Sequence, residues 1–125
     1  MSNLYKLKTI TLIVNCKEMS MLKINMEYRK GVLFVRLFGE LTKYTYKSLN
    51  DYLIPVIKNQ GIKYIVYNIQ NINKIDIYGK ECLYEGIETA RKNLGNGLIC
   101  SSNIKFKENY EVTESELTAL QKIII

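Results

Sequence analysis

The chain has 125 residues, enough for one domain, and 47% of them are hydrophobic, enough for a core. It contains no histidine and three widely separated cysteines, Cys16, Cys82 and Cys100. This composition argues against a disulfide framework, a zinc site and a Ser/His or Cys/His nucleophile pair. We therefore expect no metal and no cofactor, and cysteines that act as small buried hydrophobic residues.

The formal net charge is +6, from 18 basic and 12 acidic side chains. No stretch clusters five or more basic residues, and the excess of lysine over arginine is typical of an AT-rich genome, so we expect no nucleic-acid binding. No apolar run approaches the roughly 20 residues that span a bilayer, and none has the cleavage site of a signal peptide. These patterns favour a cytoplasmic protein that is not inserted in a membrane.

Residues 1–20 differ in pattern from the rest of the chain. The stretch TITLIV has the composition of a strand, but the sequence shows no obvious partner strand for it. Codons for Lys17 and Glu18 can resemble a bacterial ribosome-binding sequence just upstream of Met21. We therefore interpret residues 1–20 as an N-terminal extension, with translation hypothesised to begin at Met21 or Met19, and residues 21–125 as one domain.

The first regular elements follow Met21. Alternation over residues 22–28 predicts a strand, and RKG predicts a turn in which Gly31 has a positive φ. The nearly continuous apolar run over residues 32–41 predicts a central strand that is covered on both faces. A helix capped by Thr42 or Thr45 and ended by Gly61 is expected next, kinked or broken near Tyr52 by Pro55. Its apolar positions are Tyr46, Leu49, Leu53, Val56 and Ile57.

The second half of the chain continues the alternation of strands and helices. Residues 63–69 predict a strand with an irregular exit, which suggests a right-handed parallel crossover from the strand before. Residues 78–95 predict the clearest helix, ending at Gly95, and residues 97–102 and 107–112 predict short strands. The last helix is expected to follow a capping box formed by Thr113 and Glu116. Together these elements predict a small α/β sandwich in which helices pack on a mixed sheet of four to five strands.

The helix over residues 78–95 has three different faces. An apolar stripe comprises Leu83, Ile87, Ala90 and Leu94, and an acidic row comprises Glu81, Glu85 and Glu88. A stripe of small residues, Gly79, Cys82 and Gly86, predicts close approach to the sheet. We interpret the acidic row as a solvated face, because acid–base catalysis would require a cleft that the sequence does not indicate.

The turn before this helix carries the candidate site. Asp76 either accepts hydrogen bonds from the amides that open the helix or contacts a partner. Tyr78 is an exposed contact residue, a cover packed over the helix start, or a phosphotyrosine. Glu40 and Thr42, at the end of the preceding strand, are either rim residues of an interface or solvated side chains. Tyr44 and Tyr46 could extend an aromatic patch, although Tyr46 fits the core better.

Three stretches on these elements carry a family resemblance: GVLFVRLFGELT, IKYIVYNIQNINKIDIYG and ARKNLGNGLIC. They resemble the STAS domain of bacterial anti-sigma factor antagonists, in which the first stretch closes in Gly-Glu-Leu-Asp and the second continues as Asp-Ser-Ser/Thr-Gly into a helix. Asp76 and Gly79 match that turn. Ile77 and Tyr78 stand where hydroxyl residues are expected, Thr42 replaces the aspartate, and residues 100–110 are short for the usual helix there.

The resemblance implies a role in partner switching. Such antagonists bind an anti-sigma factor that is also a serine kinase, and phosphorylation of the hydroxyl residue before the glycine ends the binding. Tyr78 occupies that phospho-acceptor position, and its phenol reaches farther than a serine hydroxyl, so a kinase pocket built for serine should reject it. We predict a non-enzymatic interaction module without the serine switch that binds an anti-sigma factor/serine kinase-like protein. Its predicted contact residues are Glu40, Thr42, Asp76, Ile77, Tyr78, Gly79 and Lys80.

Two other functions are weighed against this one. In the first alternative, the loops at the strand ends hold a nucleotide or a lipid head group, and the chain is a small-ligand sensor. In the second, the chain is an enzyme, but the sequence offers no catalytic residues for it.

Overall fold

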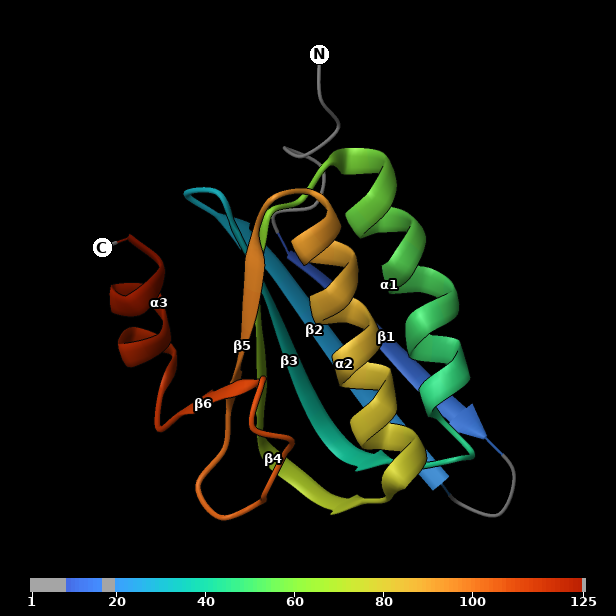
Figure 1. The fold of residues 1–125 in the computed structure, drawn as a ribbon. Coiled ribbons are helices and arrows are strands. Elements are labelled where there is room, and N and C mark those ends of the chain that lie inside the picture. The colour runs from blue at the N-terminus through green and yellow to red at the C-terminus, as the bar shows by residue number, and fades with distance from the viewer. Residues whose placement is uncertain (1–8, 17–19, 125) are drawn as a thin grey trace.

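The computed structural model describes the backbone of residues 9–16 and 20–124 and the side chains of residues 21–123. Figure 1 shows a twisted sheet with helices on both of its faces. In chain order the elements are β1 (Thr9–Cys16), β2 (Ser20–Arg29), β3 (Val32–Leu41), α1 (Tyr46–Gln60), β4 (Tyr64–Ile75), α2 (Ile77–Lys92), β5 (Asn96–Cys100), β6 (Glu111–Thr113) and α3 (Glu116–Ile124).

The described strands form one mixed sheet of six, in the order β1-β2-β3-β4-β5-β6. The β1–β2 and β2–β3 pairs are antiparallel, and the β3–β4, β4–β5 and β5–β6 pairs are parallel. The predicted α/β class, mixed sheet and parallel crossover are therefore confirmed. Five of the strands come from the region predicted to be the domain, and the sixth is β1.

Strand β1 lies in the predicted N-terminal extension and does have a partner. It pairs antiparallel with β2, from Thr9 opposite Glu27 to Cys16 opposite Ser20. No partner strand was obvious from the sequence, and the structure shows that the partner is the next strand along the chain. The hypothesis that translation begins at Met21 or Met19 stays a prediction, and a peptide of the native protein that contains Leu12 would contradict it.

The two faces of the sheet hold separate apolar cores, and β3 contributes to both. Leu33 and Val35 lie in the large core beneath α1 and α2. Val32 and Phe34 lie in the smaller core beneath α3. This alternation explains the continuous apolar run of β3 and confirms that it is a central strand covered on both faces.

Helix α1 runs unbroken from Tyr46 to Gln60 with Pro55 inside it, so the predicted break near Tyr52 was wrong. Pro55 is exposed. The backbone hydrogen bond that it cannot make therefore lies on the solvent side, while Leu53 and Ile57 on the opposite side are buried and hold the helix to the sheet. Burial of that apolar face outweighs the cost of the proline.

Strand β4 is longer than predicted, because it continues to Ile75 instead of leaving the sheet irregularly after residue 69. Pairing with β5 ends at Asn68 opposite Cys100. Beyond that point β4 pairs only with β3, with register shifts on the way. Several residues of this extension are polar and exposed, so they lack the apolar alternation that marks a strand in sequence.

Helix α2 ends at Lys92, and Leu94 is not part of its buried stripe. Leu94 is 85% exposed and takes a positive φ of 68°. Gly95 does not provide the left-handed residue that ends the helix. It allows the backbone to pass close to Lys63, since a Cβ atom at Gly95 would lie 1.7 Å from the carbonyl oxygen of Lys63. The other stripe residues, Leu83, Ile87 and Ala90, are fully buried as predicted.

The predicted capping box of α3 does not form. The helix begins at Glu116, and the hydroxyl of Ser115 accepts a hydrogen bond from the amide of Thr118 at 3.1 Å. Thr113 lies in β6 and is buried beside Cys100. The carboxylate of Glu116 binds Arg36 on β3, with nitrogen–oxygen distances of 2.7 and 2.9 Å. Ser115 provides the local cap, and Glu116 is used in a long-range ion pair.

Candidate functional site

The candidate site lies at the edge of the sheet where β3 and β4 end. Both strands are parallel, so their carboxyl ends lead into neighbouring connections. The loop after β3 spans residues 42–45, and the turn after β4 consists of Asp76 alone. Figure 1 shows these two connections side by side, at the amino ends of α1 and α2. The fold therefore brings together the two segments that the sequence singled out.

Asp76 joins the two connections. Its Oδ1 accepts a hydrogen bond from the amide of Gly79 at 2.9 Å, and its Oδ2 accepts one from the amide of Lys43 at 2.9 Å. The amide of Asp76 donates to the carbonyl of Leu41 at 3.4 Å. The predicted capping role is confirmed, and the second bond adds a tie to the loop after β3.

Two further residues keep this edge compact. A Cβ atom at Gly79 would lie 2.2 Å from the carbonyl oxygen of Leu41, so only glycine allows α2 to begin this close to β3. The hydroxyl of Thr45 donates to the carbonyl of Glu40 at 2.9 Å and accepts from the amide of Thr42 at 3.0 Å. Thr45 precedes α1 but does not cap it with its side chain. These contacts hold the loop in one conformation.

Three large side chains project from the compact base. Ile77 is 61% exposed, Tyr78 is 49% exposed and Tyr44 is 45% exposed. The ring of Tyr46 lies partly in the core, with its centroid 5.8 Å from that of Tyr78. Tyr78 therefore combines two of the expected arrangements, since one side rests on Tyr46 and the other faces outward. We refer to Tyr44, Ile77 and Tyr78 as the helix-start patch.

Of the remaining predicted contact residues, some lie at the edge of the helix-start patch and others are buried beneath it. Glu40 and Lys80 are partly exposed beside the patch, and the ammonium of Lys80 lies 5.6 Å from the ring centre of Phe106. Gly79 is buried, and Thr42 is only 3% exposed, with its hydroxyl accepting from the amide of Tyr44. Thr42 does not fit the predicted role of a rim residue, because its hydroxyl is used inside the loop.

A shallow groove of about 470 Å³ runs from the patch along α2. Its far wall includes Tyr110, whose ring stacks on that of Tyr84 with centroids 4.1 Å apart. The sequence did not indicate this wall, because Tyr110 follows an irregular segment without periodicity. The groove is lined by Tyr46, Tyr78, Glu81, Cys82, Tyr84, Glu85, Glu88 and Tyr110.

The acidic row of α2 borders this groove, and its carboxylates are engaged within the chain. Glu81 pairs with Lys107 at 3.2 Å, and Glu85 accepts from the side-chain amide of Asn50 at 2.9 Å. Glu88 accepts from the hydroxyl of Tyr110 at 2.7 Å, and that bond lowers the pKa of Glu88 below its usual value. The row is therefore a structural border of the groove as well as a solvated face.

Beneath the groove lies a buried polar cluster between α1, α2 and β4. The thiol of Cys82 donates to the amide oxygen of Asn50 at 3.1 Å, and burial raises the pKa of that thiol well above its usual value. The phenol oxygen of Tyr67 is buried beside Gly86 and has no hydrogen-bond partner among the described residues. Cys82 and Cys100 are free and buried, as predicted, and the side chain of Cys16 lies outside the described residues.

No group of three or more histidine, cysteine or acidic side chains is placed to hold a metal ion within the part of the chain whose side chains are described. No helix among residues 20–124 is both long and apolar enough to cross a membrane.

Comparison with known proteins places this geometry in a family. The model of the STAS domain family matches residues 23–122, which is most of the chain. The chain belongs to the STAS domain family. An anti-sigma F factor antagonist from Paenibacillus polymyxa is 28% identical over 82 residues, which cover 66% of this chain and 70% of that relative. The resemblance that the turn through Asp76 and Gly79 suggested is therefore confirmed.

Solved structures of anti-sigma factor antagonists share the fold of this STAS domain. SpoIIAA in its unphosphorylated form has a TM-score of 0.69 at 15% identity, and the match covers 81% of this chain and 97% of that one. An anti-sigma factor antagonist from Mycobacterium paratuberculosis has a TM-score of 0.72 at 15% identity, covering 83% and 95%. At this low identity the likeness shows a common backbone architecture.

Proposed function

We propose that this STAS domain is a non-enzymatic regulatory module of the anti-sigma factor antagonist type, which binds an anti-sigma factor or a related regulatory protein. The observation that carries the proposal is the helix-start patch, in which Tyr44, Ile77 and Tyr78 are exposed beside loops that Asp76 holds together. Adjacent exposed apolar and aromatic side chains on a rigid base are typical of protein interfaces. A cytoplasmic location is part of this proposal, because the proposed partner controls transcription.

The residues have different roles in this proposal. Ile77, Tyr78 and Tyr44 supply the apolar contact area, and Glu40 and Lys80 lie at its polar rim. Asp76, Gly79 and Thr42 act from below by fixing the loop and the first turn of α2. A preformed surface of this kind loses little conformational entropy when it binds.

The expected serine switch is absent at Tyr78. A phosphate near the amino end of a helix is tolerated by the helix dipole, but it adds about −1.5 to −2 charges that a closely packed partner surface would reject. With tyrosine in that position, we propose that binding is constitutive with respect to a serine kinase. Tyr78→Ser should become a substrate of the partner kinase if the backbone of the turn suits the kinase pocket, whereas wild type should not be phosphorylated by it.

The binding experiment compares two introduced carboxylates on the same helix region. Tyr78→Glu places a charge in the helix-start patch, and Leu94→Glu places one at an exposed leucine beyond the far end of α2. We expect Tyr78→Glu to weaken binding of the anti-sigma kinase homologue at least about tenfold by calorimetry, the equivalent of about 1.4 kcal/mol. Leu94→Glu should bind like wild type. Equal binding by both variants would show that the patch is not the contact.

The small-ligand alternative stays a prediction for the strand-end loops. A phosphate or lipid head group there would need free backbone amides at the start of α2. The amides of Gly79 and Lys43 already donate to the carboxylate of Asp76, which also makes the place acidic. A rise in melting temperature of several degrees with a nucleotide, and a larger rise in Asp76→Asn, would favour this alternative.

A further inference from the structure

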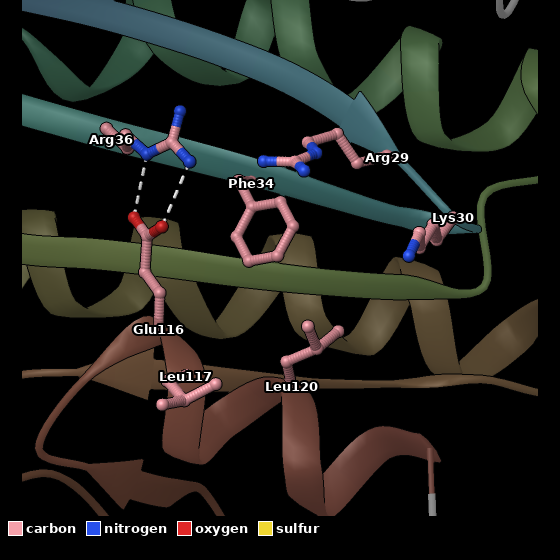
Figure 2. A pocket seen from close by; sticks show the side chains of 7 residues that line it. All are labelled: Arg29, Lys30, Phe34, Arg36, Glu116, Leu117 and Leu120. Carbon is pink, nitrogen blue, oxygen red and sulfur yellow. Dashed lines mark hydrogen bonds and ion pairs between the residues drawn. The ribbon is translucent and has the colours of Figure 1, made fainter.

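The second face of the sheet carries a cavity that the proposed partner surface does not use. It lies between the β2–β3 hairpin and α3, on the face opposite α1 and α2, with a volume of about 220 Å³. Figure 2 shows Arg29 and Lys30 at one end, the ring of Phe34 in the middle, and Leu117 and Leu120 of α3 across from it. The Arg36–Glu116 ion pair closes the other end.

The cationic end of the cavity holds two basic side chains, Arg29 and Lys30, that are weakly paired or not paired with described carboxylates. Arg36 is occupied, because Glu116 binds it twice and Glu27 binds it at 2.9 Å. The side chain of Arg29 is 62% exposed, and among the described residues it forms an ion pair with Glu27 through a single contact at 3.5 Å. Lys30 makes no salt bridge with any residue whose side chain is described. Arg29 and Lys30 can therefore accept an anion without breaking a strong existing pair.

Lys30 also occupies a conformation that lysine does not favour. It has a φ of 51°, and Gly31 after it has a φ of 83°, so both central residues of this hairpin turn are left-handed. Asparagine, aspartate and glycine are the residues that such a turn prefers. Backbone strain that the local sequence does not relieve is a reason to look for a function at that residue.

The middle of the cavity is apolar. Leu117 is 65% exposed although it lies on the same helix as the buried Ala119, so its side chain borders the cavity instead of the core. Phe34 is almost fully buried in the sheet and presents a ring to the same space. The volume is below the range of sites for drug-sized ligands, which limits an occupant to a compact molecule.

We propose that this cavity binds a compact carboxylate with an aromatic or branched aliphatic body. The carboxylate would lie between Arg29 and Lys30, since guanidinium groups bind carboxylates with paired hydrogen bonds. The apolar body would pack between Phe34 and the two leucines of α3. Such a ligand bridges the β2–β3 turn and α3, so binding couples the position of α3 to the ligand without involving the helix-start patch.

Methyl NMR of the full chain tests whether the cavity binds such carboxylates. The probes are phenylacetate and 3-methylbutanoate, and phenylacetamide is the uncharged control for phenylacetate. We expect the carboxylates to shift the methyl signals of Leu117 and Leu120 saturably, with the amide binding at least about tenfold more weakly. Lys30→Asn should weaken phenylacetate binding at least about fivefold while raising the melting temperature, because asparagine suits the turn. These opposite effects separate binding from folding.

The control is Lys105→Asn, which removes the same charge from an exposed residue outside the cavity and should leave both quantities unchanged. Equal affinity for phenylacetate and phenylacetamide would overturn the proposal, as would unchanged phenylacetate binding in Lys30→Asn. The absence of saturable shifts at both leucines up to about 5 mM of either carboxylate would overturn it too, since millimolar ligands bind substantially at that concentration.

Discussion

At the scale of single residues, the carboxylate of Asp76 has the widest structural effect at the candidate site. One oxygen caps α2 through Gly79, and the other holds Lys43 in the loop after β3. Because each bond joins a charged acceptor to a backbone donor, each is stronger than a neutral hydrogen bond. The exposed side chains of the helix-start patch depend on this single group for their relative positions.

Removing this carboxylate should destabilise the domain. We expect Asp76→Ala to lower the free energy of unfolding by about 1–2 kcal/mol, the usual cost of losing a helix cap. Asp51→Ala is the control, since Asp51 lies exposed on α1 and forms a weak ion pair with Lys47 at 3.7 Å. It should cost less than about 0.5 kcal/mol. Urea unfolding of both variants measures the difference, and equal losses would contradict the role assigned to Asp76.

The contact between Gly86 and Tyr67 gives a second prediction. A Cβ atom at Gly86 would lie 1.7 Å from the phenol oxygen of Tyr67, so Gly86→Ala should destabilise by about 1–3 kcal/mol despite the better helix propensity of alanine. Tyr67→Phe removes a buried hydroxyl without a described partner and should be nearly neutral. In the Tyr67→Phe background, Gly86→Ala should cost clearly less. Additive effects in this double-mutant cycle would mean that the oxygen is not the obstacle.

At the scale of elements, α3 is held to the sheet by a small core, by a polar cluster around Glu116 and by an ion pair between Lys122 and Glu111 of β6 at 2.7 Å. Ala119 is buried, and Leu120 and Ile123 pack partly against the residues of the second core. Glu116 binds Arg36 of β3 and, at 2.8 Å, the side-chain amide of Asn68 of β4. The cluster therefore joins α3 to two central strands.

This cluster predicts a dependence of stability on pH. Burial opposes ionisation of Glu116, but the hydrogen bonds from Arg36 and Asn68 outweigh it and hold the pKa of Glu116 below its usual value. An unfolded glutamate has a pKa of about 4.3, so the stabilisation is present above that pH and is lost as the pH falls through the lower folded pKa.

Glu116→Gln should therefore be less stable than wild type at pH 7 and should lose less stability on acidification below about pH 4.5. The neighbouring exposed residue Glu114 provides the control, and Glu114→Gln should keep the slope of wild type. Free energies of unfolding measured between neutral and acidic pH compare the slopes. Parallel curves for wild type and Glu116→Gln would contradict the proposed role of the cluster.

The elements that follow local rules could be predicted from sequence. Strand β3 has the expected bounds, and α2 begins directly after its aspartate cap, because apolar period and capping chemistry act within a few residues. The start of α3 could not be predicted in the same way, because the carboxylate of Glu116 is bound by Arg36, which is 80 residues away in the sequence. The same holds for Pro55, whose cost is offset by the burial of α1 against the sheet.

At the scale of the whole molecule, the sheet separates two surfaces with different chemistry. The helix-start patch lies at the amino ends of α1 and α2, and the cationic cavity lies on the face of α3. A protein partner on one surface and a small carboxylate on the other can therefore bind at the same time. Coupling between them would pass through the central strand β3, whose Phe34 and Arg36 line the cavity and whose end leads into the loop that carries Tyr44.

The candidate site was only partly visible in the sequence. The segments around Glu40 and Asp76 were paired correctly, since parallel strands of one crossover end at the same edge. The burial of Thr42 and the wall formed by Tyr110 were not foreseen, because both depend on how a loop folds back on a helix. The exposure of individual loop side chains depends on tertiary contacts, and the periodicity of hydrophobic residues in the sequence does not reveal those contacts.

Hydrogen exchange of the chain alone and in complex with the anti-sigma kinase homologue tests the central claim most directly. We expect binding to slow exchange at the amides of residues 42–45 and 77–82 and to leave those of α3 and the β2–β3 turn unchanged. Slower exchange confined to α3 and the β2–β3 turn, with residues 77–82 unaffected, would contradict it.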